Sequence, residues 1–269
     1  MIPLWSNPEF IRNCRAQLRP RRILLAASLI AALSLVVGYS TYQVYSGKPD
    51  WGKTFFSVAL YAQLYTLCLG GGFACMRSIS LEREQNTFDF QRVTQLSSLE
   101  LSLGKLFGAP ALAYFAALCM LPAALVGAVA GGIPVSHVVG AYVILVAGSI
   151  AVQSLTLLFS LTATKTGVGV AGLGGMVLIF IFLMISGSPE PSRTFLDLGT
   201  LGPSAANEFA MRGAWKVEAM PVGIPPQLIS TSAWTDVFFG LPVYHLPVLL
   251  GLYLTFTIWC LVPLARNLK

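Results

Sequence analysis

The chain has 269 residues, of which 55% are hydrophobic and only 10% are charged. A soluble domain carries roughly 25% charged residues, and the mean hydropathy here is +0.73, so composition excludes an ordinary soluble protein and predicts an integral membrane protein. The net charge of +6 is typical of basic segments on one side of a membrane, and we expect no nucleic acid partner.

Residues 1–22 predict a basic amphipathic helix that lies in the plane of the lipid headgroups. Pro8 can occupy the first turn of this helix, with Asn7 as its N-cap. Apolar residues follow at helical spacing, namely Phe10, Ile11, Cys14 and Leu18. Arginines take much of the remaining surface, namely Arg12, Arg15 and Arg19. The alternative is a solvated basic tail that only sets the topology. No small-residue cleavage site follows promptly, so a signal peptide is not expected.

Six apolar segments follow, each of about 20 residues or more, which is enough to cross a hydrocarbon core of about 30 Å. They are expected at 23–44, 54–76, 106–130, 135–161, 168–186 and 242–265. The long polar connections are 77–105 and 187–241. Because we find no internal repeat and no second soluble domain, we predict an all-α membrane protein with a single transmembrane domain over residues 1–269.

Basic residues are concentrated in the N-terminal region, in 77–105 and at the C-terminus. By the positive-inside rule these parts are cytoplasmic, and 187–241 is an external loop. An even number of spans agrees with this orientation, because it places both termini on one side. We therefore expect a multi-pass protein of a bacterial-type inner (plasma) membrane.

The six predicted spans contain no Asp, Glu, Lys or Arg. A transporter that is driven by an ion gradient normally keeps an ionisable residue at membrane depth, where the ion binds. If this chain moves a solute, we expect the energy to come from another protein.

Motifs for catalysis or nucleotide binding are also missing from the sequence. There is no GxSxG, HExxH or GxxxxGK[ST] pattern. The GxGxxG match at 167–172 opens an apolar span instead of following a strand, so it indicates helix packing. The two histidines, His137 and His245, lie at predicted span edges, and the five cysteines lack metal-ligand spacing. We expect neither an enzyme nor a metal or cofactor bound by this chain.

The segment 77–105 carries eight ionisable residues, which lipid cannot solvate, so it lies outside the bilayer. Residues 80–93 can form a short helix with acidic residues early and Arg92 late, as the helix dipole favours. Such a projecting helix suits docking on a soluble partner. An ordinary loop with solvated charges is the alternative.

The order of residues in this segment carries a resemblance. The relevant positions are Glu82-Arg83-Glu84, Thr87, Asp89, Thr94, Leu96-Ser97, Leu99-Glu100 and Gly104-Lys105-Leu106. In this order they resemble, without a gap, the signature E-R-E-x-G-T-x-D-L-L-x-x-T-P-L-S-x-x-E-I-x-x-G-K of type-2 ABC exporter permeases. The departures are Asn86 for Gly, Gln95 for Pro, and Gln91 for the second residue of the apolar Leu-Leu pair. The Asn7-Pro8 opening, the six-span layout and the long external loop are also similar to this family.

The resemblance implies a half-transporter. Two permease subunits, identical or different, would pair, and each would dock a cytoplasmic ABC ATPase that binds ATP and Mg. The residues implied in docking the ATPase are Glu82, Arg83, Glu84, Thr87, Asp89 and Arg92. The N-terminal helix would touch the same ATPase. The external loop would form short helices, for which 205–215 and 232–239 are the candidates.

No charge marks a transport path, so a path at the dimer interface would be lined by polar or flexible residues of the first, second and fifth spans. The candidates for lining a path are Tyr61, Gln63, Tyr65 and Thr66. Gln63 would be costly facing lipid, although packing between helices explains Gln63 and Gln153 equally well. An uncharged path favours export of an amphipathic or lipid-like cargo.

Two other function classes stay open at this point. The same six spans suit a non-transporting membrane scaffold or assembly subunit of a larger complex. They also suit an intramembrane enzyme that uses Ser, Thr or Asn. Dependence on a separate ATPase distinguishes the exporter from both.

Overall fold

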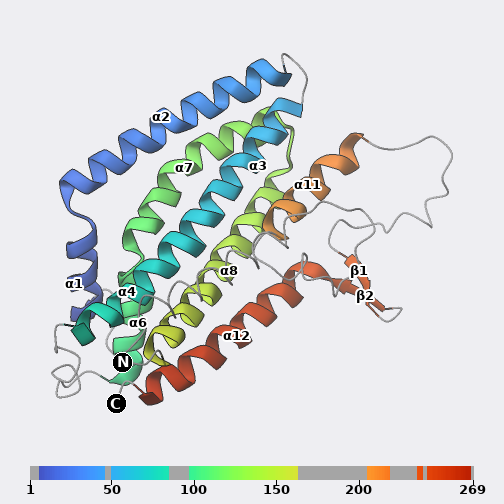
Figure 1. Ribbon diagram of the computed structural model, residues 1–269. Coiled ribbons are helices and arrows are strands. Elements are labelled where there is room, and N and C mark those ends of the chain that lie inside the picture. The colour runs from blue at the N-terminus through green and yellow to red at the C-terminus, as the bar shows by residue number, and fades with distance from the viewer. Residues whose placement is uncertain are drawn as a thin grey trace.

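The computed structural model describes residues 6–45, 50–84, 97–162, 205–218, 235–238 and 241–267. These residues are almost entirely helical, and the long helices form an elongated bundle (Figure 1). The helices are α1 (Pro8–Gln17), α2 (Pro20–Tyr45), α3 (Asp50–Tyr65), α4 (Gly71–Glu84), α6 (Ser98–Gly108), α7 (Ala111–Ala130), α8 (Val135–Thr162), α11 (Ala205–Glu218) and α12 (His245–Asn267).

Five helical stretches are long and apolar enough to cross a membrane. They are Pro20–Tyr45, Trp51–Ile79, Ala111–Ala130, Val135–Leu161 and Leu246–Arg266. The chain is therefore a helical protein of the multi-pass membrane type, as its composition predicts. The further span expected at 168–186 lies outside the described residues.

The second of these stretches is one continuous helix built from α3, a π-helical turn at Thr66–Gly70 (η2) and α4. It begins earlier than the sequence suggested, because α3 starts at Asp50. Lys53, expected in a loop, is a buried residue of α3 instead. The expectation that every Lys and Arg lies outside the spans is therefore wrong for Lys53.

The predicted start of the third span, at residue 106, is also wrong. Residues 98–108 form a separate helix, α6, and a turn at Ala109 and Pro110 divides it from α7. Proline lacks an amide hydrogen and cannot continue a helix without losing a hydrogen bond, and Pro110 stands at the N-cap of α7. The apolar run is continuous across this point, so hydropathy alone did not separate the two helices.

One end of the bundle brings together α1, α6, the last turn of α4 and the last turn of α12 (Figure 1). We call it the charged end. A buried apolar cluster holds it together, made of Cys75, Ile79, Leu101, Leu106, Ala109, Leu157, Leu161 and Leu264. Four helices that are distant in sequence thus share one small core next to α1.

The opposite end carries α11 and a two-stranded antiparallel sheet of β1 (Thr235–Phe238) and β2 (Leu241–Tyr244). The helix predicted at 205–215 is confirmed, as α11. The helix predicted at 232–239 is wrong, because Thr235–Phe238 is a strand that pairs with Leu241–Tyr244. The same pairing moves the start of the last helix from 242 to His245.

The main core lies between α3, α7 and α8, and the α3–α7 crossing depends on glycine. A Cβ added to Gly127 would lie 2.7 Å from the amide nitrogen of Phe56, and one added to Gly131 would lie 2.7 Å from that of Lys53. Two backbones can approach this closely only where side chains are absent, as in other membrane helix pairs.

Candidate functional site

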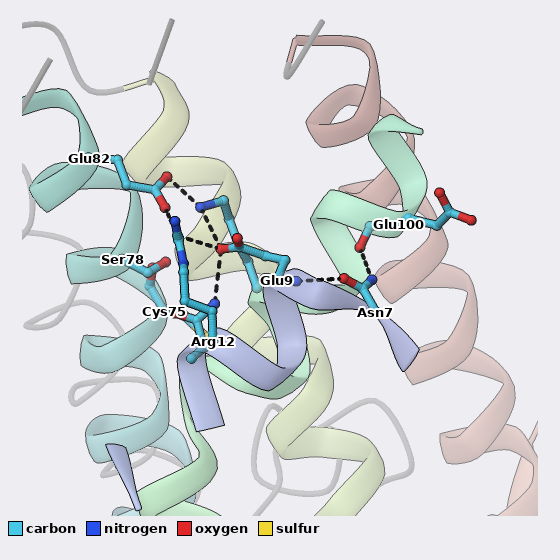
Figure 2. A network of polar contacts seen from close by, with 9 residues as sticks. Asn7, Glu9, Arg12, Cys75, Ser78, Glu82 and Glu100 are labelled. Carbon is cyan, nitrogen blue, oxygen red and sulfur yellow. Dashed lines mark hydrogen bonds and ion pairs between the residues drawn. The ribbon is translucent and has the colours of Figure 1, made fainter. Parts of the chain in front are cut away.

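Asn7 both starts α1 and attaches it to α6. The Asn7 Oδ1 accepts a hydrogen bond from the Glu9 backbone amide at 3.0 Å, which is the N-cap contact that the sequence predicts. Its Nδ2 donates to the Glu100 carbonyl oxygen at 2.7 Å. One side chain therefore sets the position of the α1 N-terminus relative to another helix (Figure 2).

The α6 helix presents glycines where α1 crosses it. A Cβ on Gly104 would lie 3.0 Å from the Glu9 Cβ, and one on Gly108 would lie 2.9 Å from the Asn13 Cβ. The start of α6 is fixed by a capping box, in which Ser97 and Glu100 each bond the backbone amide of the other. The GxxxG spacing thus allows α1 to lie directly against α6.

Four ionised side chains meet where α1, α4 and α6 converge, and we call Glu9, Arg12, Glu82 and Lys105 the charge network. One Arg12 nitrogen lies 2.9 Å from the Glu9 Oε1 and 2.6 Å from the Glu82 Oε1. The Lys105 Nζ bonds Glu82 and lies 3.4 Å from the Glu9 Oε1. Asn13 Nδ2 also donates to the Glu9 Oε1, at 3.0 Å. Figure 2 shows the Glu82 side chain pointing from α4 toward Glu9 and Arg12.

The charge network is neutral in sum and largely removed from solvent. Lys105 is 1% exposed and Glu9 6%, whereas the Arg12 side chain is 56% exposed. A buried charge is tolerated only with a partner, and removing one partner from such a pair costs about 3–5 kcal/mol. Replacing Lys105 or either carboxylate should therefore lower the stability of the fold more than replacing Arg12.

The predicted docking residues divide into three groups. Glu82 faces inward, where Arg12 and Lys105 bind it, and its predicted role in docking an ATPase stays a prediction. Arg83 and Glu84 stand in the last turn of α4. Thr87, Asp89 and Arg92 lie outside the described residues. The predicted helix over 80–93 agrees with α4 as far as Glu84, as a continuation of the second span.

The three arginines predicted on the N-terminal helix also differ in their surroundings. Arg12 belongs to the charge network, whereas Arg15 and Arg19 are exposed. The predicted helix at 1–22 is real but shorter, since α1 ends at Gln17 and α2 begins at Pro20.

Sequence analysis missed two members of the charge network, Glu9 and Lys105. The available signals were the i, i+3 spacing of Glu9 and Arg12 and the lone lysine in the apolar run LSLGKLFG. Neither signal identifies Glu82 as the shared partner, because 70 residues separate it from Arg12.

Gln63, proposed to line a path, is instead bound between helices. Its Nε2 donates to the Ala117 carbonyl of α7 at 3.0 Å, and the Tyr142 hydroxyl of α8 donates to its Oε1 at 2.9 Å. The side chain is 1% exposed. This geometry supports the helix-packing alternative for Gln63.

The other predicted path residues lie on the same helix with different partners. Tyr61 and Tyr65 are half-buried, with ring centroids 6.5 Å apart, and Asn207 of α11 lies 3.4 Å from the Tyr61 hydroxyl. The Thr66 hydroxyl donates to the Ala62 carbonyl within its own helix, at 2.7 Å. Of the four residues, Tyr61, Tyr65 and Thr66 are half-buried and keep some surface available to a ligand or a neighbouring subunit, whereas Gln63 does not.

Gln153 of α8 binds the π-helical turn. Its Nε2 donates to the Leu67 carbonyl at 3.0 Å, and its Oε1 accepts from the Tyr114 hydroxyl. Any Cβ on Gly71 would collide with this amide group. A π-turn interrupts the regular bonding of an α-helix and often marks a functional position; here a neighbouring helix satisfies the affected carbonyl.

Within the described ranges, no group of three His, Cys, Asp or Glu residues is placed to hold a metal ion. No family model, no curated protein and no solved structure matches this chain.

Proposed function

We propose that this chain is the membrane-spanning permease subunit of an ATP-driven exporter of the type-2 ABC kind. The observation that carries the proposal is how the two ends of the segment 85–96, which follows the E-R-E residues, are joined to the rest of the chain. Its two flanks are the last turn of α4 and the capped start of α6, and α1 is bound to both through the charge network. A partner that moves the segment between them therefore acts on three helices together.

The proposed mechanism transmits ATP-driven closure of a cytoplasmic ATPase through residues 85–96 into the spans. Thr87, Asp89 and Arg92 are the proposed contacts, and Glu82 holds the flank of the segment in place. Force on α4 reaches the membrane core without a break, because α3, the π-turn and α4 form one helix. ATP and Mg would bind to the partner ATPase.

The six-span topology is part of the same proposal. The chain leaves α8 at the charged end and returns in α11 at the opposite end (Figure 1), which supports one further crossing at 168–186. The charged end would face the cytoplasm of a bacterial-type inner membrane, in agreement with the positive-inside rule. A second permease subunit would complete the transporter.

An amphipathic or lipid-like cargo fits the surfaces that the structure describes. The buried polar side chains Gln63 and Gln153 already have partners within the bundle. Many of the large exposed side chains on α2, α7 and α12 are apolar, which suits a cargo that travels at or beside the lipid boundary.

The test is to extract the chain gently from its membrane and identify the proteins that co-purify by mass spectrometry. We expect a stoichiometric subunit with a phosphate-binding loop, and we expect Asp89→Lys to abolish its recovery while membrane insertion stays intact. Asp50→Lys, at the opposite end, is the matched charge reversal and should retain the ATPase. Recovery of the chain alone, or only with unrelated membrane proteins, would favour the scaffold function.

A further inference from the structure

The junction between α1 and α2 is surrounded by unbalanced positive charge. Its arginines are Arg15, Arg19, Arg21 and Arg22, which we call the arginine elbow. All four are exposed, and none forms an ion pair with another residue in the described part of the chain. The sequence has no Asp or Glu between Glu9 and Asp50.

The buried carboxylates of α1 and α4 do not pair with these arginines, because they are bound to other side chains. Glu9 and Glu82 form the charge network with Arg12 and Lys105. The network is neutral in sum, so the arginine elbow keeps its full positive charge. An anionic partner is therefore favoured from outside the chain.

The helix that follows the elbow offers an apolar surface to the same partner. Of the 26 residues of α2, only Ile30 is buried. Leu25, Leu29 and Leu33 follow Arg21 and Arg22 at helical spacing, and their exposed fractions are 70%, 61% and 54%. A basic surface thus continues directly into an apolar one along α2.

We infer that the arginine elbow and this face of α2 bind an anionic phospholipid. The guanidinium groups hold the phosphate, since the planar donors of arginine match a phosphate in a two-point geometry. The acyl chains lie along Leu25, Leu29 and Leu33. A soluble phosphate would use the arginines but leave the apolar face unused, and for this reason the structure favours a lipid.

The experiment is native mass spectrometry of the full-length chain in mild detergent, with phosphatidylglycerol and phosphatidylcholine of identical acyl chains at equal concentration. We expect phosphatidylglycerol to be retained preferentially. Each basic residue near an anionic surface contributes about 1 kcal/mol, so Arg19→Gln or Arg22→Gln should each weaken phosphatidylglycerol binding about fivefold. Binding of phosphatidylcholine should not change.

The matched control is Arg266→Gln, which removes an exposed arginine at the end of α12 and should leave the preference intact. Equal retention of both lipids, or an equal loss in the control, would overturn the inference. Displacement of the lipid by millimolar glycerol phosphate would reassign the elbow to soluble anions. A further variant, Leu29→Cys, tests whether two copies of the chain meet at this face. If they form a disulfide even in the presence of phosphatidylglycerol, the α2 face belongs to a second subunit. The measurement needs no ATPase, so its outcome is independent of the proposed exporter function.

Discussion

At the scale of single residues, the most consequential side chain is Glu82, which the resemblance to exporter permeases implies in docking and which the structure places inside the charge network. It is the one described acid of α4 that joins α1 to this helix, through Arg12. It also neutralises Lys105, which is 1% exposed. Without the Glu82 carboxylate, the buried ammonium group of Lys105 would have Glu9 as its only acidic partner among the described ion pairs.

We expect Glu82→Gln to lower the free energy of unfolding by about 3 kcal/mol, because Lys105 keeps only Glu9 as a charged partner. Adding Lys105→Met to this variant restores a neutral pair of Glu9 and Arg12 and should recover most of the loss. Thermal unfolding of the two single variants and the double variant measures this coupling. Strictly additive losses would show that the two side chains do not act together.

At the scale of elements, α1 is held by shape as well as charge. Gly104 and Gly108 of α6 allow its backbone to lie close, and Asn7 bonds the Glu100 carbonyl. The amphipathic pattern of α1 predicted a helix on a membrane surface. It did not predict that Glu9 and Asn13 would face another helix. That contact depends on Gly104 and Gly108, which lie 95 residues or more further along the chain.

Detachment of α1 can be followed at Cys14. Burial raises the pKa of this thiol, and only the thiolate reacts with maleimides, so at pH 8 a bound α1 should be labelled slowly. Gly108→Val places a side chain against Asn13 and should displace α1. The pKa of Cys14 then falls toward its ordinary value, so labelling at pH 8 becomes faster and its pH midpoint moves down.

This measurement uses a chain in which the other cysteines are replaced by alanine, namely Cys68, Cys75, Cys119 and Cys260. Gly251→Val is the matched control, because a Cβ at Gly251 meets nothing within 4 Å. An unchanged labelling rate in Gly108→Val would show that the glycine contact does not hold α1 in place.

At the scale of the whole molecule, the bundle has two chemically different ends. The helices α1 and α6 and the last turns of α4 and α12 lie at the charged end, whereas α11 and the β1–β2 pair lie at the other (Figure 1). Lys53 is buried near this second end, in α3. The two ends therefore differ in chemistry, and the E-R-E residues 82–84 lie at the charged end.

Labelling from each side of the membrane tests this arrangement. Single cysteines at Leu99 of α6 and Arg266 of α12 should react with an impermeant maleimide from one side. A cysteine at Val135, where α8 begins, should react only from the other. In the proposed orientation the first two face the cytoplasm. Reaction of Leu99→Cys and Arg266→Cys from opposite sides would contradict the fold.

The sequence by itself determined the membrane class, the approximate position of the five described spans, the N-cap at Asn7 and the helix at 205–215. These features depend on properties that are local in the chain, such as the length of an apolar run or the side chain that precedes a helix. They need no knowledge of which segments meet in space.

Only the tertiary structure decided the inward orientation of Glu82, the partnership of Glu9 with Lys105, and the binding of Gln63 and Gln153 between helices. Each depends on contacts across 23 to 96 residues of sequence. The strand at 235–238 was missed for a different reason, since its partner at 241–244 is close in sequence and the pairing overrode the helical pattern. Burial of a polar group is favourable only when a partner arrives from elsewhere in the fold, and hydropathy does not record that partner.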